Sequence, residues 1–192
     1  MKSMTRIWLR MRRSALDLSG DCRGLAAVEF AMIVPLMLVL FFGTVEFSSG
    51  IAVNRKVTLM ARTLSDLTSQ NVTVTDTQLT NIFNASTGIM TPYSTTPVNS
   101  TITELYVDPT SKVARVQWSK GSSPRGAGTT VAIPTALQVG GTYLIFSEVS
   151  YTYVPAIGYV MTKSGITMRD STYTRPRQST CVMYSTAACT TT

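Results

Sequence analysis

The feature that most constrains this chain is an uninterrupted apolar span close to its N-terminus. Between residues 25 and 45 the only ionisable side chain is Glu29, and Thr44 is the only other polar one. A helix rises about 1.5 Å per residue and needs about 20 apolar residues to cross the hydrocarbon core of a bilayer. Pro35 is compatible with such a helix, because kinks are tolerated inside membranes. The span therefore predicts a membrane-crossing helix.

A basic leader precedes the span. Before residue 24 the sequence contains six lysine and arginine residues and only two aspartates. A basic flank of this kind stays on the cytoplasmic side of a membrane. Residues 1–24 are therefore expected to be a cytoplasmic leader, with the C-terminal part of the chain outside. A secretory signal peptide is the competing interpretation, but its apolar core usually has about 7–15 residues and ends in a small-residue cleavage site. No A-x-A-like site follows this longer span.

The helical pattern continues beyond the membrane span. Apolar side chains recur mostly at three- and four-residue spacings, at Ile51, Val53, Val57, Leu59, Met60, Leu64 and Leu67. This spacing predicts one helix over residues 25–70, whose second half is amphipathic.

The rest of the chain alternates valines and tyrosines with polar residues, which favours β-structure. The patterns at 100–108 and 111–119 predict a hairpin, 140–155 predicts a long central strand, and 164–174 predicts a final strand. Residues 71–192 have room for a single core. The predicted fold class is α+β, in which a long N-terminal helix is followed by a small, extracytoplasmic, antiparallel β-sheet domain.

Two local patterns refine this outer domain. The segment DTQLTNIFNAST predicts a short helix N-capped near Asp76. Tyr143, Tyr151 and Tyr153 lie in the most apolar segment outside the membrane span, so they are expected to pack in the core or in cross-strand pairs rather than to bind a cofactor.

The three cysteines fit the same topology. Cys22 lies in the leader, whereas Cys181 and Cys189 lie close together near the C-terminus, where an oxidising compartment allows them to pair. Two cysteines without any histidine make a poor zinc site, so no metal site is expected. We predict a disulfide between Cys181 and Cys189, with two free thiols as the alternative.

Composition argues against catalysis and against nucleic-acid binding. Much of the net charge of +7 belongs to the leader, where membrane topology explains it. Without histidine, neither a Ser-His nor a Cys-His nucleophile is available, and the adjacent Lys163 and Ser164 would point to opposite faces of a strand. The carboxylates beyond the helix are scattered through the sequence. We expect no enzyme and no cofactor.

The acid inside the span has two interpretations. In a lone anchor, Glu29 lies near enough to the end of the span to reach the interface at modest cost. In an assembly, a carboxylate in an apolar setting gains strongly by meeting a cation, such as the α-amino group of a neighbouring subunit. The sequence TVEF at 44–47 echoes AVEF at 27–30, and its acid, Glu46, is expected to be solvated at the opposite membrane surface.

Several of these motifs match a known pattern. The basic leader, Gly24, the residues LAAV and then Glu29-Phe30 ahead of an apolar helix resemble the processing and assembly signal of type IV pilins, particularly the Flp branch, where tyrosine is usual in place of Phe30. The segment from Arg23 to Phe47 more closely resembles the opening of TadE-type proteins, pseudopilins or minor pilins of the tight-adherence pilus system. The motifs YTYVP at 151–155 and RPR at 175–177 are similar to later elements of that family.

The resemblance implies a function in assembly. Cleavage would fall between Gly24 and Leu25, and Glu29-Phe30 would be read by the prepilin peptidase and by neighbouring subunits. Implied partners are other pilin-like subunits, tight-adherence platform proteins, the peptidase and the bacterial inner membrane, with incorporation into an extracellular pilus. Two alternatives stay open: a signal-anchored periplasmic envelope or interaction protein outside any pilus, and an assembly-platform component that remains in the membrane.

Overall fold

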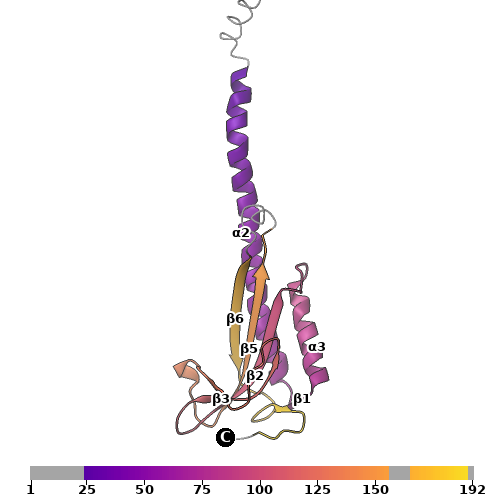
Figure 1. Ribbon diagram of the computed structural model, residues 1–192, viewed down its shortest axis with the longest axis vertical. Helices are drawn as coiled ribbons and strands as arrows, with labels where there is room; N and C mark the ends of the chain where they lie inside the picture. The colour runs from indigo at the N-terminus through magenta and orange to yellow at the C-terminus, as the bar shows by residue number, and fades with distance from the viewer. Residues whose placement is uncertain (1–23, 156–164, 190–192) are drawn as a thin grey trace, which may run out of the picture. The chain divides into compact units, whose positions relative to one another are not determined.

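The computed structural model describes residues 24–155 and 165–189. The chain divides into two compact units, one ending at Val45 and the other beginning at Glu46. Helix α2, Leu25–Ser69, contributes its first part to one unit and its second part to the other (Figure 1). Except for Gly24, the predicted leader, with Cys22, lies outside the described residues, as do Lys163 and Ser164.

The described part of the first unit is a helix with apolar side chains on every side. None of the residues from Gly24 to Val45 is buried, although most of them are large and hydrophobic. Pro35 lies inside the helix, as expected. The helix is long and apolar enough to cross a membrane. Because a helix that is hydrophobic all round needs apolar surroundings, this part of the chain indicates membrane anchoring.

The second unit is built on a five-stranded antiparallel sheet of order β4-β3-β2-β5-β6. Its strands are β2 (Val98–Val107), β3 (Ala114–Gly121), β4 (Thr130–Val131), β5 (Tyr143–Tyr153) and β6 (Ile166–Thr174). The second part of α2 covers one face of this sheet, beside helix α3, Asp76–Thr87 (Figure 1). Short 3-10 helices lie at η2 (Gly88–Met90) and η3 (Thr135–Leu137).

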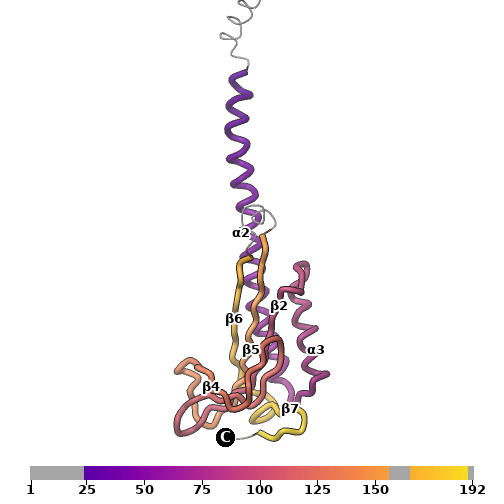
Figure 2. The backbone as a smooth tube through the Cα atoms, in the orientation of Figure 1, coloured from indigo at the N-terminus to yellow at the C-terminus, as the bar shows by residue number. Residues whose placement is uncertain are grey.

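The C-terminal segment returns to the start of the domain. Strand β7, Met183–Tyr184, pairs in parallel with β1, Thr73–Val74, which lies between α2 and α3 (Figure 2). Strand β7 therefore lies beside the segment that follows α2, although the two are more than a hundred residues apart in the sequence.

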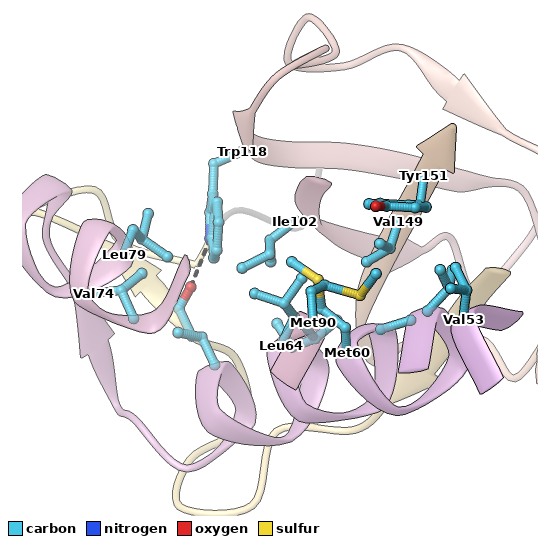
Figure 3. Packing of buried hydrophobic residues seen from close by; sticks show 14 of the residues in the cluster. Val53, Met60, Leu64, Val74, Leu79, Met90, Ile102, Trp118, Val149 and Tyr151 are labelled. Atoms are coloured by element: carbon cyan, nitrogen blue, oxygen red, sulfur yellow. Dashed lines mark hydrogen bonds between the residues drawn. The ribbon is translucent and has the colours of Figure 1, made fainter. Parts of the chain in front are cut away.

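The main core forms between α2 and the inner face of the sheet. Fully buried side chains of α2 recur at four- and three-residue spacings, at Val53, Val57, Met60, Ala61 and Leu64. They pack against Ile102 of β2 and Ile145 and Val149 of β5 (Figure 3). Burying a side chain of valine or leucine size contributes roughly 1.5–3 kcal/mol relative to its exposure. The second half of α2 is therefore an integral part of the domain core.

The predicted fold class is confirmed, and the strands lie close to the expected positions. β2 and β3 form the predicted hairpin. Tyr143, Tyr151 and Tyr153 are all buried, as expected. The predicted long central strand is β5, which lies inside the sheet between β2 and β6. The middle strand of the five is β2.

Helix α3 forms in the predicted segment, and its N-cap lies next to Asp76. Thr75, not Asp76, is the N-cap, and its side chain accepts a hydrogen bond from the Gln78 backbone while the Gln78 side chain accepts one from the Thr75 backbone. This reciprocal pair is a capping box, and it requires a side-chain oxygen three residues before a glutamine. Asp76 then occupies the first helical turn, where its charge favours the helix dipole.

Candidate assembly site

The predicted processing and assembly residues all lie at the N-terminal end of α2. The helix begins at Leu25, directly after Gly24, and Glu29 and Phe30 follow in its second turn. All four residues are exposed. Leu25 and Glu29 are four positions apart, so they lie on the same side of the helix. The structure places the acid among exposed apolar neighbours, including Val28, Met32 and Ile33, and its predicted role is untested by this geometry.

In residues 24–155 and 165–189, no group of three or more histidine, cysteine, aspartate or glutamate side chains comes together in a way that could hold a metal ion. From Leu25 to Val45, α2 presents an apolar helical surface with one carboxylate, that of Glu29. Such a surface is suited to contacts with lipid or with other apolar helices, in which the acid requires a cationic partner.

Hydrogen bonds join the second half of α2 to the sheet. Ser147 of β5 donates to the Ala61 carbonyl over 2.6 Å, and Ser65 donates to Thr174 of β6 over 2.7 Å. Thr58 also donates to the carboxylate of Asp170 on β6. These side chains satisfy polar groups at the helix–sheet contact, where unsatisfied groups would be costly. These hydrogen bonds also fix the axial position of α2 relative to β5 and β6.

The two later sequence motifs contribute to the same helix–sheet unit. In YTYVP, Tyr151 and Tyr153 are buried, and Tyr153 makes an edge contact with Tyr93, their ring centroids 6.4 Å apart. In RPR, Arg177 forms an ion pair with Asp66 and donates its backbone N–H to the carbonyl of Ser69 over 2.9 Å. Both motifs therefore hold α2 to the domain.

Glu46 is less solvated than the sequence suggests. Its carboxylate is half-buried and accepts a hydrogen bond from the Tyr153 hydroxyl over 2.9 Å. Burial, followed by this contact with Glu46, raises the pKa of the Tyr153 phenol. The contact joins residues separated by more than a hundred positions, which is why local sequence patterns give no sign of it.

Residues 24–64 match the family described as TadE-like protein. The predicted resemblance is confirmed. No curated protein and no solved structure matches the chain. The match covers the apolar anchor with Glu29 and continues to Leu64, the last large buried hydrophobic side chain of α2. It associates the chain with the tight-adherence pilus system through the helix alone, since the β-domain beyond Leu64 lies outside it.

Beyond the TadE-like segment, sequence reasoning missed one buried acid. Glu104 of β2 is 1% exposed and accepts a 2.6 Å hydrogen bond from the Val182 backbone N–H. Trp118 of β3 donates to the Val182 carbonyl over 2.8 Å, as the dashed line in Figure 3 shows. Desolvation raises the pKa of Glu104 to about 7, although hydrogen bonding to this carboxylate from the Val182 backbone and from the Trp118 side chain opposes the shift. Glu104 and Trp118 therefore bind the backbone N–H and the backbone carbonyl of Val182, in the C-terminal segment.

The same C-terminal segment contains the predicted disulfide cysteines. The structure joins Cys181 to Cys189, with their Cα atoms 6.2 Å apart, which is within the range that a disulfide spans. Cys181 is buried against Tyr106 and Tyr143, whereas Cys189 is exposed. The bond would close a short loop next to Val182, the residue that Glu104 and Trp118 hold.

Proposed function

We propose that this chain is a non-catalytic, TadE-like minor pilin or pseudopilin that takes part in assembly of a tight-adherence pilus of the Flp, type IVb, class. The observation that carries this proposal is the TadE-like helix, whose exposed apolar surface contains one acid, Glu29. The outer domain packs against the second half of the same helix. This combination suits a subunit that assembles through its helix and presents its domain outside.

In the proposed mechanism, a prepilin peptidase cuts between Gly24 and Leu25. The cut creates a free α-amino group on Leu25 and removes the basic leader. Glu29 of one subunit then pairs with the amino terminus of a neighbouring pilin-like subunit, and Phe30 contributes to the apolar contact around the pair. In a medium of low dielectric constant this attraction is much stronger than in water, so it fixes the axial register of neighbouring helices.

The proposed topology follows from the charge of the leader. The basic residues keep the N-terminus in the cytoplasm, α2 crosses the inner membrane once, and the β-domain lies in the periplasm. An oxidising periplasm would allow the Cys181–Cys189 disulfide to form. Platform proteins of the tight-adherence system are the proposed membrane partners, before or during incorporation into the fibre.

The deciding experiment measures the intact mass and N-terminal sequence of the protein from native membranes, with and without the prepilin peptidase. A chain that begins at Leu25 only when the peptidase is present is the expected result. A chain that begins at Met1 under both conditions would overturn the processing step and favour an uncut, signal-anchored envelope protein.

A second experiment separates a fibre subunit from a platform component. Pili are sheared from cells, and the sheared fraction is probed for this protein and for its Glu29→Ala variant. We expect the wild-type protein in the fibre fraction and the variant only in the membrane. Asp76→Asn, which removes an exposed acid from the outer domain, is the matched control and should behave as the wild type. Retention of wild-type protein in the membrane alone would favour the platform role.

A further inference from the structure

An apolar groove lies in the second unit, at the part of α2 with which this unit begins. It has a volume of about 510 Å³ and is lined by one face of α2 and by the facing ends of β5 and β6. The helix contributes Phe47, Gly50 and Ile51, and the strands contribute Tyr153, Ile166 and Met168. Phe47 is 71% exposed and Ile166 is 57% exposed, so the groove has a wide apolar rim.

Gly50 contributes no side chain to the helical side of the groove. A Cβ atom placed on Gly50 would lie 3.9 Å from the terminal methyl of Met168 and would meet no other atom within 4 Å. Phe47, Gly50, Ile51 and Asn54 recur at three- and four-residue spacings and so share one helical face. A larger residue than glycine at the centre of this face would project into the hollow.

The position of the groove along the chain identifies its surroundings. The apolar span ends at Val45, and the groove begins at the next residue, Glu46, on the same helix. From Phe47 to Asn54 the helix rises about 10 Å at roughly 1.5 Å per residue. The polar headgroup region of a bilayer is about 5–8 Å thick on each side. If α2 crosses the membrane over the apolar span, these turns occupy that interfacial layer.

The side chains also match the chemistry of a phospholipid. Arg55 is exposed, and among the residues of α2 that line the groove it is the farthest from the apolar span. Helical side chains lean toward the N-terminus of their helix, and a long arginine side chain is able to extend to an interface. Glu46, the other charged residue of the lining, is engaged by the Tyr153 hydroxyl. One cation next to an apolar hollow complements one phosphate attached to acyl chains.

We propose that this groove is a lipid-binding site that holds a phospholipid of the bilayer in which the helix is anchored, with apolar contacts from Ile51, Ile166 and Met168 and with Arg55 at the phosphate. This inference rests on the membrane anchoring of α2, which is part of the proposed function, and is independent of leader cleavage and of Glu29 pairing.

The test uses the full chain in vesicles of phosphatidylethanolamine and phosphatidylglycerol that carry bromine on their acyl chains near the glycerol. Trp8→Phe removes one native tryptophan, and the other, Trp118, is buried within the domain and serves as the internal reference. Tryptophan is then introduced singly as Phe47→Trp, as Ile166→Trp or as Leu59→Trp. Leu59 is an exposed apolar residue of α2 outside the groove, and it provides the matched control.

We expect bromolipid to quench most of the added fluorescence of Phe47→Trp and Ile166→Trp and to leave that of Leu59→Trp unchanged. Adding Gly50→Leu, which fills the groove, should restore the fluorescence of Ile166→Trp and leave Phe47→Trp quenched. An unchanged near-ultraviolet circular dichroism signal of Trp118 verifies the fold of each variant.

Three outcomes would overturn the proposal. Quenching of Phe47→Trp without quenching of Ile166→Trp would retain the membrane anchor and reject the lipid site. Absence of quenching in both would reject the anchor itself, and with it the proposed function. A photoreactive residue at position 166 that forms adducts with a second copy or with another protein, and none with lipid, would show that a polypeptide occupies the groove.

Discussion

The two halves of α2 are both rich in apolar residues, yet they meet very different surroundings. Up to Val45 no described residue is buried, whereas Val53, Val57, Met60 and Leu64 are completely inaccessible to solvent. The first half carries apolar residues on all sides, and the second half restricts them largely to one face. The comparison shows that hydrophobicity alone does not assign a helix to a membrane or to a core. The angular distribution of the apolar residues makes that distinction.

The largest expected effect tests the difference between the two halves of α2. Leu64→Ala should lower the free energy of unfolding of the domain by about 2–5 kcal/mol, because it leaves a cavity in the core. Leu36→Ala makes the same chemical change on the exposed half and should leave domain stability unchanged. Denaturant unfolding of the full chain in detergent, followed by Trp118 fluorescence, measures both. Equal losses would show that the two halves do not differ as described.

The second expected effect concerns Glu104, whose pKa is raised by burial from 4.5 to about 7. The native state binds this proton more tightly than the unfolded state, so the stabilisation is complete below pH 4.5. It is lost as pH rises toward and through 7. Its size is about 3 kcal/mol, since each pKa unit corresponds to 1.36 kcal/mol. Glu104→Gln should remove this pH dependence and make the protein at pH 8 at least as stable as the wild type.

The measurement for Glu104 is the free energy of unfolding at several pH values between 4 and 8. Glu148→Gln provides a comparison, because Glu148 belongs to a half-exposed ion pair with Arg125 on the other face of the sheet. It should retain the pH dependence of the wild type over this range. A wild-type protein whose stability rises steadily with pH would contradict the assignment to Glu104.

The third expected effect tests the C-terminal closure. Cys181→Ser together with Cys189→Ser should lower stability by about 2–3 kcal/mol if the disulfide forms, because the bond closes a short loop and restricts the unfolded chain. Alkylation of the uncut chain under non-reducing conditions, followed by intact mass measurement, should label Cys22 alone, and a chain that begins at Leu25, which lacks Cys22, should stay unlabelled. Labelling of Cys181 and Cys189 in protein from an oxidising compartment would show that these two cysteines remain free. Cys22→Ser should leave stability unchanged.

Features that depend on local sequence patterns could be predicted from the sequence, whereas features that depend on contacts between distant residues could not. The strands, the long helix and the buried tyrosines follow from alternation and spacing within a few residues. The TadE-like anchor was recognisable because its motif is contiguous, from Gly24 to Phe47. Burial of Glu104 depends on its contact with Val182, 78 residues away, and no local pattern specifies that contact. The groove depends in the same way on a glycine in α2 and on residues of β6.

The smallest expected effect distinguishes the two arginines of the RPR motif. Arg177→Ala removes the ion pair with Asp66 and should cost less than about 1 kcal/mol, because both side chains are largely exposed and water screens their attraction. The loss should shrink at high salt, since added ions weaken an exposed pair. Arg175→Ala removes an exposed arginine two residues earlier and should have no effect on unfolding at either salt concentration. Equal effects of the two substitutions would mean that the motif acts through its net charge, and the contact between Arg177 and the end of α2 would then contribute nothing specific to holding the helix in the domain.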